Sequence, residues 1–394
     1  MLSEVLQELE SDGLLRRLPP EVETPGPRIE REGRSLICLA SNNYLGLSTH
    51  PHVIETSCSA LRLSGCGSSG SRLLSGNLEV HSLLEQRLAR FKGAESGLLF
   101  NSGYAANLSI LGALARPGDR IVGDKLNHAS LHDGAKASGA EYRVYRHGDL
   151  KRARELLADA PSGSRKFLVT DGVFSMDGDV AALPELIAIA RETGTVLIVD
   201  EAHATGVLGP RGKGTFEHFG ITCDAKLLGL PALVVMGTLG KALGGFGAYA
   251  LTDRETRDVL INRARPFIFS TALPPAVAGA ALGALDQIER EPELIARLRQ
   301  NSDYFRNGLK ARGFRVSSDP TPIVPIRVGE ADRAVEFSRL LLEEGVIAFA
   351  VRPPSVAPGT SRIRATVMAT HELSDLRQSL EAFEKAGRAC KVIP

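Results

Sequence analysis

Short apolar runs, several of them rich in β-branched residues, recur along the chain, and helical patterns lie between them. The clearest of these runs lie at residues 97–100, 120–122, 167–170, 196–199 and 234–236. A helical pattern at 183–191 is followed by Gly194, which is typical of a helix C-terminus. Strands that alternate with helices in this way predict a largely parallel sheet with helices on both of its faces.

The last third of the chain has a different pattern. Residues 323–326, 346–349 and 363–367 predict three further strands, and residues 373–383 predict a helix. A chain of 394 residues also exceeds the usual size of a single hydrophobic core. We therefore expect an α/β protein with three parts: an N-terminal helix and extended arm at 1–45, a large α/β domain at 46–280, and a small C-terminal α+β domain at 281–394.

The composition is typical of a globular protein, with 43% hydrophobic and 24% charged residues. The formal net charge is +1, and basic and acidic residues are interspersed, so we expect neither a nucleic-acid nor a membrane partner. Five scattered cysteines without a C-x-x-C pair predict reduced thiols, with no disulfide and no metal site. The acidic, amphipathic start at residues 2–9 differs from a signal peptide, which predicts a cytoplasmic location.

Three polar residues follow closely after two of the apolar runs. Asp200 and His203 come after the run at 196–199, and Lys241 comes after the run at 234–236. Polar groups at the ends of core strands cost free energy unless they perform chemistry. A lysine can capture an aldehyde as a Schiff base, and a carboxylate can keep a ring nitrogen protonated, so this set predicts pyridoxal 5′-phosphate (PLP). The ordinary alternatives are a helix cap for Asp200 and a solvated surface position for Lys241.

Other segments offer the remaining parts of a PLP site. Residues 101–107 come where a strand turns into a helix, and free N–H groups there can bind a phosphate, to which Thr238 could add a hydroxyl. His128 could stack on the cofactor ring. Arg364 alternates with apolar residues on a strand and could clamp a carboxylate. The alternatives are an ordinary capped turn, a loop histidine and, above all for Arg362, a solvated strand face.

Segments along nearly the whole chain resemble those of the α-oxoamine synthases, which are PLP-dependent enzymes of the aspartate-aminotransferase fold. The similar segments are residues 42–47, 67–76, 100–107, 127–130, 173–179, 200–209, 237–245 and 369–372. The resemblance implies fold type I, in which a large PLP-binding domain holds a mostly parallel sheet between helices and a smaller α+β C-terminal domain follows. It also implies a homodimer, in which Ser270 and Thr271 reach the phosphate site of the partner subunit.

The resemblance also implies roles for individual residues. It makes Lys241, His128 and Asp200 the catalytic residues. It implies that Asp200 contacts the ring nitrogen, His203 contacts the ring oxygen and His128 stacks on the ring. The full set of cofactor contacts that it implies is Gly103, Tyr104, His128, Ser175, Asp200, His203, Thr238 and Lys241. It makes the substrate contacts those of Arg16, His128, Ser355 and Arg364.

The reaction that the resemblance implies is a decarboxylating condensation of an amino acid with an acyl thioester. Within the family, residues 352–356 and 358–360 are most similar to members that join L-alanine to pimeloyl-CoA or pimeloyl-acyl carrier protein. Arg364 would hold the carboxylate of alanine, and Lys241 would remove its α-proton. A member that uses glycine or serine with another acyl-CoA is an alternative, and a PLP-binding protein without catalytic activity is a more remote one.

Overall fold

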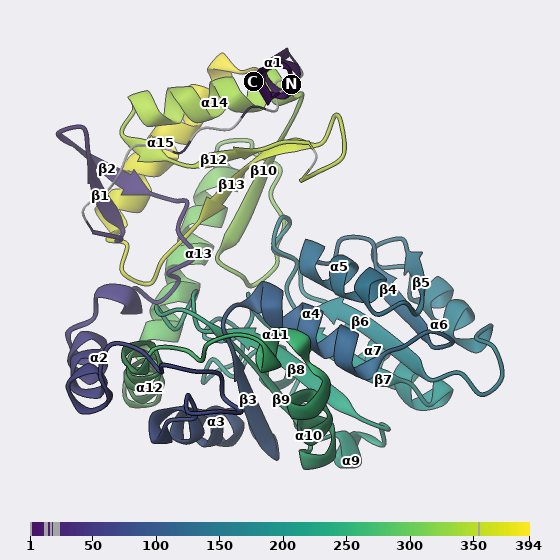
Figure 1. Ribbon diagram of the computed structural model, residues 1–394. Helices are drawn as coiled ribbons and strands as arrows, with labels where there is room; N and C mark the ends of the chain where they lie inside the picture. Colours follow the sequence, from purple (N-terminus) through teal and green to yellow (C-terminus); the bar gives the residue numbers. More distant parts are fainter. Residues whose placement is uncertain (1, 12–14, 16–17, 19–23, 354) are drawn as a thin grey trace.

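A seven-stranded sheet forms the centre of the larger part of the molecule (Figure 1). The computed structural model describes residues 2–11, 15, 18, 24–353 and 355–394. From one edge to the other, the strands are β3 (Ser96–Phe100), β9 (Ala248–Thr252), β8 (Leu233–Thr238), β7 (Val196–Asp200), β6 (Lys166–Asp171), β4 (Arg120–Asp124) and β5 (Glu141–Tyr145). Neighbours from β8 to β5 pair in parallel, whereas β9 runs antiparallel to β3 and β8. The largely parallel sheet that the sequence predicts is confirmed.

The apolar runs correspond to β3, β4, β6, β7 and β8, but the pattern misses β5 and β9. Strand β5 lies at the edge of the sheet, where Arg143 and Val144 are exposed. An edge strand carries polar residues, so no continuous apolar run marks it. Strand β9 is buried throughout, but two of its five residues are alanines, so its sequence has no run of large aliphatic side chains like those of β7 and β8.

Helices cover both faces of the sheet, as predicted. One face packs against α4 (Gly103–Leu114), α5 (Ala129–Ala137), α10 (Arg254–Arg263) and α11 (Arg265–Ile268). The other face packs against α3 (Glu79–Lys92), α6 (Leu150–Ala158), α7 (Leu183–Thr193) and α12 (Pro275–Arg290), and α2 (Pro51–Ser64) lies on α12. Leu197 and Val199 belong to one core and Ile198 to the other, because successive side chains of a strand point to opposite faces. Short helices η1 (Leu47–Thr49), α8 (Thr215–His218) and α9 (Ala225–Leu228) lie in the connections.

A second core lies in the last third of the chain, beside an antiparallel sheet. Its strands, in order, are β10 (Ile323–Gly329), β13 (Ser361–Thr366) and β12 (Phe349–Val351). They pack with α13 (Glu293–Ala311), α14 (Ala331–Glu343) and α15 (Leu373–Ala389). The single strand predicted at 346–349 is divided, because β11 (Val346–Ile347) pairs with β2 (Arg34–Cys38) and β12 pairs with β13.

The N-terminal segment has more regular structure than the predicted extended arm. Helix α1 (Leu2–Ser11) is confirmed, and β1 (Arg28–Arg31) forms an antiparallel hairpin with β2. Glu32 and Gly33 have positive φ in the two-residue turn between them, which suits the twist of a hairpin. Ile37 and Leu39 belong to the second core. We propose the boundaries at residues 45 and 280 as the limits of the three domains.

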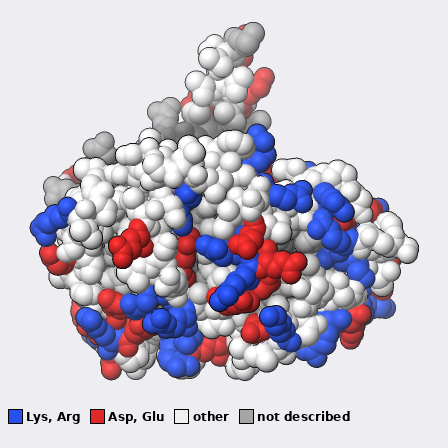
Figure 2. Space-filling model, turned by 60° about the horizontal axis from the view of Figure 1, so that its bottom comes forward, with Lys and Arg blue, Asp and Glu red and all other residues white. Residues whose placement is uncertain are grey.

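The surface is mixed in charge. On the face shown in Figure 2, basic and acidic side chains are interspersed. None of the described helices is long and apolar enough to cross a membrane.

Candidate active site

A cavity of about 180 Å³ opens where the parallel strands end. Asp171, Asp200 and Thr238 are the last residues of β6, β7 and β8. Because the carboxyl ends of parallel strands meet at one edge of a sheet, residues far apart in the sequence converge there. Every residue for which the sequence predicts a cofactor contact lines this cavity: Gly103, Tyr104, His128, Ser175, Asp200, His203, Thr238 and Lys241.

Lys241 lies in the turn between β8 and β9, with its amine against a histidine. Its Nζ is 2.8 Å from Nε2 of His203. The turn needs a glycine at position 244, because Gly244 has a positive φ and a Cβ atom there would collide with the backbone of Ser48. Burial lowers the pKa of Lys241 to about 8, although the nearby Asp200 carboxylate acts in the opposite direction. A lysine with such a pKa is a better nucleophile near neutral pH than an ordinary surface lysine.

Asp200 is a buried carboxylate that two donors hold in place. Its Oδ2 accepts a hydrogen bond of 2.8 Å from Nδ2 of Asn107, and its Oδ1 accepts one of 2.9 Å from the N–H of Ala202. Asp171 is its register partner on the neighbouring strand. Burial, together with the charge of Asp200, raises the pKa of Asp171 well above its usual range. The two carboxylates therefore lie side by side, and this environment favours the protonated form of Asp171.

His128 lies at the start of α5, next to both carboxylates. Its backbone N–H donates a 2.9 Å hydrogen bond to Oδ2 of Asp171. Its Nδ1 lies 2.7 Å from Oγ of Ser130 and accepts a hydrogen bond from the N–H of that residue. Burial lowers the pKa of His128, and the charge of Lys241 lowers it further. The nearby Asp200 acts in the opposite direction. A neutral, fixed imidazole in the cavity wall suits the predicted stacking on a ring.

The start of α4 has the features of a phosphate site. Oγ of Ser102 caps the helix by accepting a hydrogen bond from the N–H of Ala105. Gly103 and Tyr104 come next, and the first N–H groups of a helix have no acceptor within it. Oγ1 of Thr238 accepts from the N–H of Gly240 and donates to the carbonyl of Gly247, so its position is fixed.

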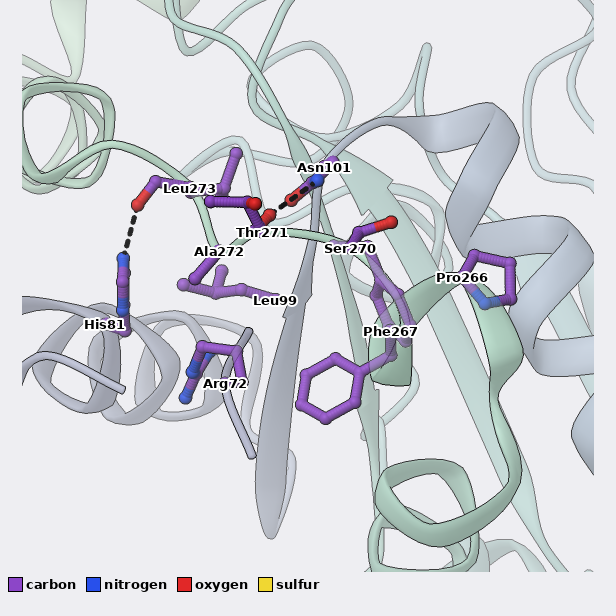
Figure 3. Close-up of a pocket in the computed structure, with 11 residues that line it drawn as sticks. Arg72, His81, Leu99, Asn101, Pro266, Phe267, Ser270, Thr271, Ala272 and Leu273 are labelled. Carbon is purple, nitrogen blue, oxygen red and sulfur yellow. Dashed lines mark hydrogen bonds between the residues drawn. The ribbon is translucent and has the colours of Figure 1, made fainter. Parts of the chain in front are cut away.

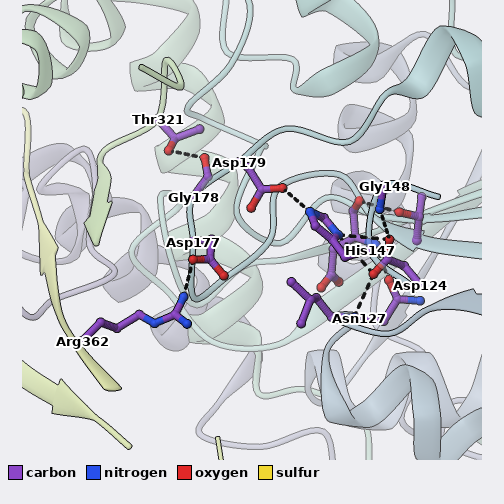
Figure 4. Close-up of polar contacts among 12 residues, drawn as sticks. Asp124, Asn127, His147, Gly148, Asp177, Gly178, Asp179, Thr321 and Arg362 are labelled. Carbon is purple, nitrogen blue, oxygen red and sulfur yellow. Dashed lines mark hydrogen bonds and ion pairs between the residues drawn. The ribbon is translucent and has the colours of Figure 1, made fainter. Parts of the chain in front are cut away.

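Arg364 approaches the site from the second core; it does not line the cavity itself but contacts Ser175, which does. On β13, its Nε donates a 2.6 Å hydrogen bond to the carbonyl of Ser175, and both Nη atoms donate to Oδ1 of Asn42. The expectation of a solvated strand face for Arg362 is wrong. Arg362 is buried and forms an ion pair with Asp177 (Figure 4), because the loop that carries Ser175 packs across this face of β13.

Comparison with known proteins places the fold in a family. The family model of class I and II aminotransferases matches residues 34–383. The chain belongs to this family. A relative named 8-amino-7-oxononanoate synthase from Geobacter sulfurreducens is 48% identical over 98% of each chain. A solved structure of SPT (serine palmitoyltransferase) with a PLP internal aldimine is 32% identical, covers 100% of this chain and 98% of its own, and has a TM-score of 0.92. An 8-amino-7-oxononanoate synthase structure from Francisella tularensis is 32% identical, covers 90% and 98%, and has a TM-score of 0.77.

Membership of the aminotransferase family confirms the predicted fold type I. Two predicted substrate contacts, Arg16 and Ser355, remain to be considered. Arg16 lies outside the described residues. Ser355 is exposed in the segment after β12, where its N–H donates to the carbonyl of Arg352. Both substrate contacts stay predictions.

Ser270 and Thr271 line a different cavity of this aminotransferase-family fold, with a volume of about 10 Å³ (Figure 3). Nδ2 of Asn101, the residue before the cap of α4, donates a 2.9 Å hydrogen bond to the carbonyl of Thr271. The two hydroxyl residues therefore lie close to the start of α4 without lining the Lys241 cavity. Their contact with a partner subunit stays a prediction.

Sequence reasoning assigned no role to several residues that hold the site. Tyr44 is fully buried, with its hydroxyl 2.5 Å from Nδ1 of His203. Asn42 holds Arg364, Asn107 holds Asp200, and Asp171 holds the backbone of His128. The sequence does show a polar run at 42–44 between buried leucines. It does not show what this run contacts, because the partners of Asn42 and Tyr44 lie more than a hundred positions away.

Proposed function

We propose that this chain catalyses the decarboxylating condensation of L-alanine with pimeloyl-CoA or pimeloyl-acyl carrier protein. The products are 8-amino-7-oxononanoate, CO₂ and the free thiol carrier. One observation carries the proposal: the amine of Lys241 lies against His203 in a cavity that Asp200 also lines. The 48% identity to an 8-amino-7-oxononanoate synthase supports this choice of reaction.

The residues of the cavity fit PLP as the cofactor. Lys241 has an amine of lowered pKa for the aldehyde, and Asp200 has a fixed carboxylate for the ring nitrogen. Gly103 and Tyr104 line the cavity at the start of α4, where a phosphate would bind. When bound, PLP supplies an aldehyde that captures amines and a cationic ring that takes up electrons released at the α-carbon.

The chain's own residues bind the amino acid and move its proton. Arg364 would bind the carboxylate of alanine through its guanidinium, whose Nε is anchored on the carbonyl of Ser175. Nζ of Lys241 would take the α-proton and later return one, which its pKa of about 8 permits near neutral pH. His128 would cover the cofactor ring and keep the reacting bond in the orientation that the ring can stabilise.

Two further parts of the proposal concern the whole protein. We propose a homodimer in which Ser270 and Thr271 approach the partner's phosphate, and a cytoplasmic location. Light scattering would give the mass of the assembly, and the double variant S270A/T271A would test the contact. The variant should need more PLP for saturation, while a monomer in solution would contradict the proposal.

A second candidate is another α-oxoamine condensation, such as that of serine or glycine with a different acyl-CoA. The closer superposition with SPT, at a TM-score of 0.92 against 0.77 for the Francisella enzyme, favours keeping serine in the test. Alanine, glycine and serine are each incubated with pimeloyl-CoA, acetyl-CoA and palmitoyl-CoA, and products are identified by mass spectrometry. We expect 8-amino-7-oxononanoate from alanine and pimeloyl-CoA. Product from serine and palmitoyl-CoA alone would overturn the proposal.

A further inference from the structure

A buried tyrosine completes an unbroken chain of contacts from the amine to the arginine. Nζ of Lys241 lies 2.8 Å from Nε2 of His203, and Nδ1 of the same ring lies 2.5 Å from the hydroxyl of Tyr44. That hydroxyl lies 3.2 Å from Oδ1 of Asn42, which also accepts from both Nη atoms of Arg364. The side chain of Tyr44 is fully buried, so these contacts are shielded from bulk solvent.

The donors and acceptors in this series of contacts determine which atom carries each proton. An ammonium has donors only, so protonated Lys241 must donate to Nε2 of His203. The neutral imidazole then carries its proton on Nδ1 and donates it to the oxygen of Tyr44. The hydroxyl proton of Tyr44 has one remaining acceptor, which is Oδ1 of Asn42.

The charges around this chain agree with that assignment. Burial lowers the pKa of His203 well below its usual range, and the cations of Lys241 and Arg364 add to this effect, as does His128. Burial also raises the pKa of Tyr44, so the phenol keeps its proton. The Lys241 ammonium and the Tyr44 oxygen then favour the same tautomer of His203, because the first donates to Nε2 and the second accepts from Nδ1–H.

We propose that Tyr44 is a positioning residue whose hydroxyl holds His203 in the Nδ1–H tautomer, so that the lone pair of Nε2 faces Lys241. This rests on the proposed function in one respect, that Lys241 is the reacting amine. Through Asn42, the same hydroxyl joins the amine to Arg364. Both the pKa of Lys241 and the orientation of Arg364 therefore depend on the hydroxyl oxygen of Tyr44.

The variant Tyr44→Phe removes that oxygen and keeps the ring. The matched control is Tyr249→Phe: Tyr249 is also fully buried, and its hydroxyl lies 3.0 Å from Oγ1 of Thr205, outside the Lys241 cavity. Two readouts use protein without substrate. Histidine ¹⁵N NMR of the PLP-free protein, with His203→Gln for assignment, gives the tautomer. The pH dependence of PLP capture, followed by absorbance, gives the midpoint for Lys241.

The wild type should show a protonated Nδ1 and an unprotonated Nε2 at neutral pH. In Tyr44→Phe the Nδ1–H tautomer should lose population, and the midpoint for PLP capture should fall by about half a unit to one unit, the size expected for one lost hydrogen bond. Tyr249→Phe should match the wild type in both readouts. If Tyr44→Phe does not fold, Asn42→Ala takes its place, because the Tyr44 proton, without its acceptor, would then compete with the ring proton for Nδ1 and shift the tautomer population in the same direction.

An unchanged tautomer and midpoint in Tyr44→Phe would overturn the proposal. An equal change in Tyr249→Phe would also overturn it, because loss of any buried hydroxyl would then account for the result. Failure of the proposed function is a separate outcome. If the protein forms no 8-amino-7-oxononanoate, or binds no PLP, the tautomer in the PLP-free protein still decides the role of Tyr44.

Discussion

Two histidines of this molecule have opposite electrostatic surroundings. His203 lies between the amine of Lys241 and the hydroxyl of Tyr44, and burial lowers its pKa well below the usual range. His147 lies between the carboxylates of Asp124 and Asp179, and its hydrogen bonds to them raise its pKa to about 10. The first is a neutral ring whose tautomer matters, and the second is a cation that joins two anions. Neighbours from other segments decide which role a histidine has.

The cation at His147 holds a loop that belongs to the site. Asp179, which contacts His147 (Figure 4), lies in the loop between β6 and α7. The same loop carries Ser175, whose carbonyl anchors Arg364. The second core holds the same loop through Thr321, whose hydroxyl donates a 2.7 Å hydrogen bond to the carbonyl of Gly178. His147 therefore supports the position of Arg364 by charge, from a distance, while His203 contacts the amine of Lys241 directly.

The largest effect should come from Lys241→Ala. Loss of the amine that captures the aldehyde and moves the α-proton should reduce the turnover of alanine by about 10³-fold or more. The Lys241 cation is also one cause of the low pKa of His203, so that pKa should rise in the PLP-free variant. The pKa of His147 should stay near 10, since its partners are unchanged. NMR titration of both rings checks this, and a His203 pKa that does not move would contradict the account of its surroundings.

The next effect should come from Asp200→Asn, which keeps the shape and removes the charge. The loss of a charge-assisted hydrogen bond to the ring nitrogen should lower turnover by about 10²-fold. Asp200 raises the pKa of Lys241, so the midpoint of PLP capture should fall below about 8. Absorbance against pH measures this. Asp179→Asn is the control, because it neutralises a carboxylate at the other histidine and should leave that midpoint in place.

A smaller effect should come from His147→Gln, because it acts through the loop. Asp124, with a side chain only 3% exposed, would lose its cationic partner, which should cost about 1–3 kcal/mol of unfolding free energy. Since the loop positions Arg364, the KM for alanine should rise by about 3- to 10-fold with little change in kcat. The control is His218→Gln, in α8 and outside the cavity. An equal rise of KM in both variants would refute the link through the loop.

The sequence predicted those parts of the molecule that local pattern determines. The strands that end at Asp171, Asp200 and Thr238 are apolar runs, so the edge where the site forms could be located from them. Lys241 and His203 were found because polar residues after core strands are uncommon. These features depend on neighbours along the chain, which a pattern can register.

The parts that depend on tertiary contacts were missed or wrong. Tyr44 meets His203 across 159 positions, and nothing near Tyr44 indicates that contact. Arg362 alternates with apolar residues as an exposed strand residue does, but the loop at Asp177 covers it. The high pKa of His147 likewise requires two carboxylates from separate segments.

The smallest effect concerns the pH dependence of stability. The pKa of His147 is raised from about 6.5 in the unfolded chain to about 10 in the folded protein. A raised pKa means that the folded state binds the proton more tightly, so the stabilisation is complete below pH 6.5 and is lost as pH rises toward 10. Because the side chain is 33% exposed, solvent screening should make the loss smaller than the full shift implies. The difference in unfolding free energy between the wild type and His147→Gln, measured with denaturant, should shrink across this window. In Asp179→Asn one carboxylate remains, so the loss should occur at lower pH. A difference that stays constant from pH 7 to pH 10 would show that His147 is neutral, as His203 is.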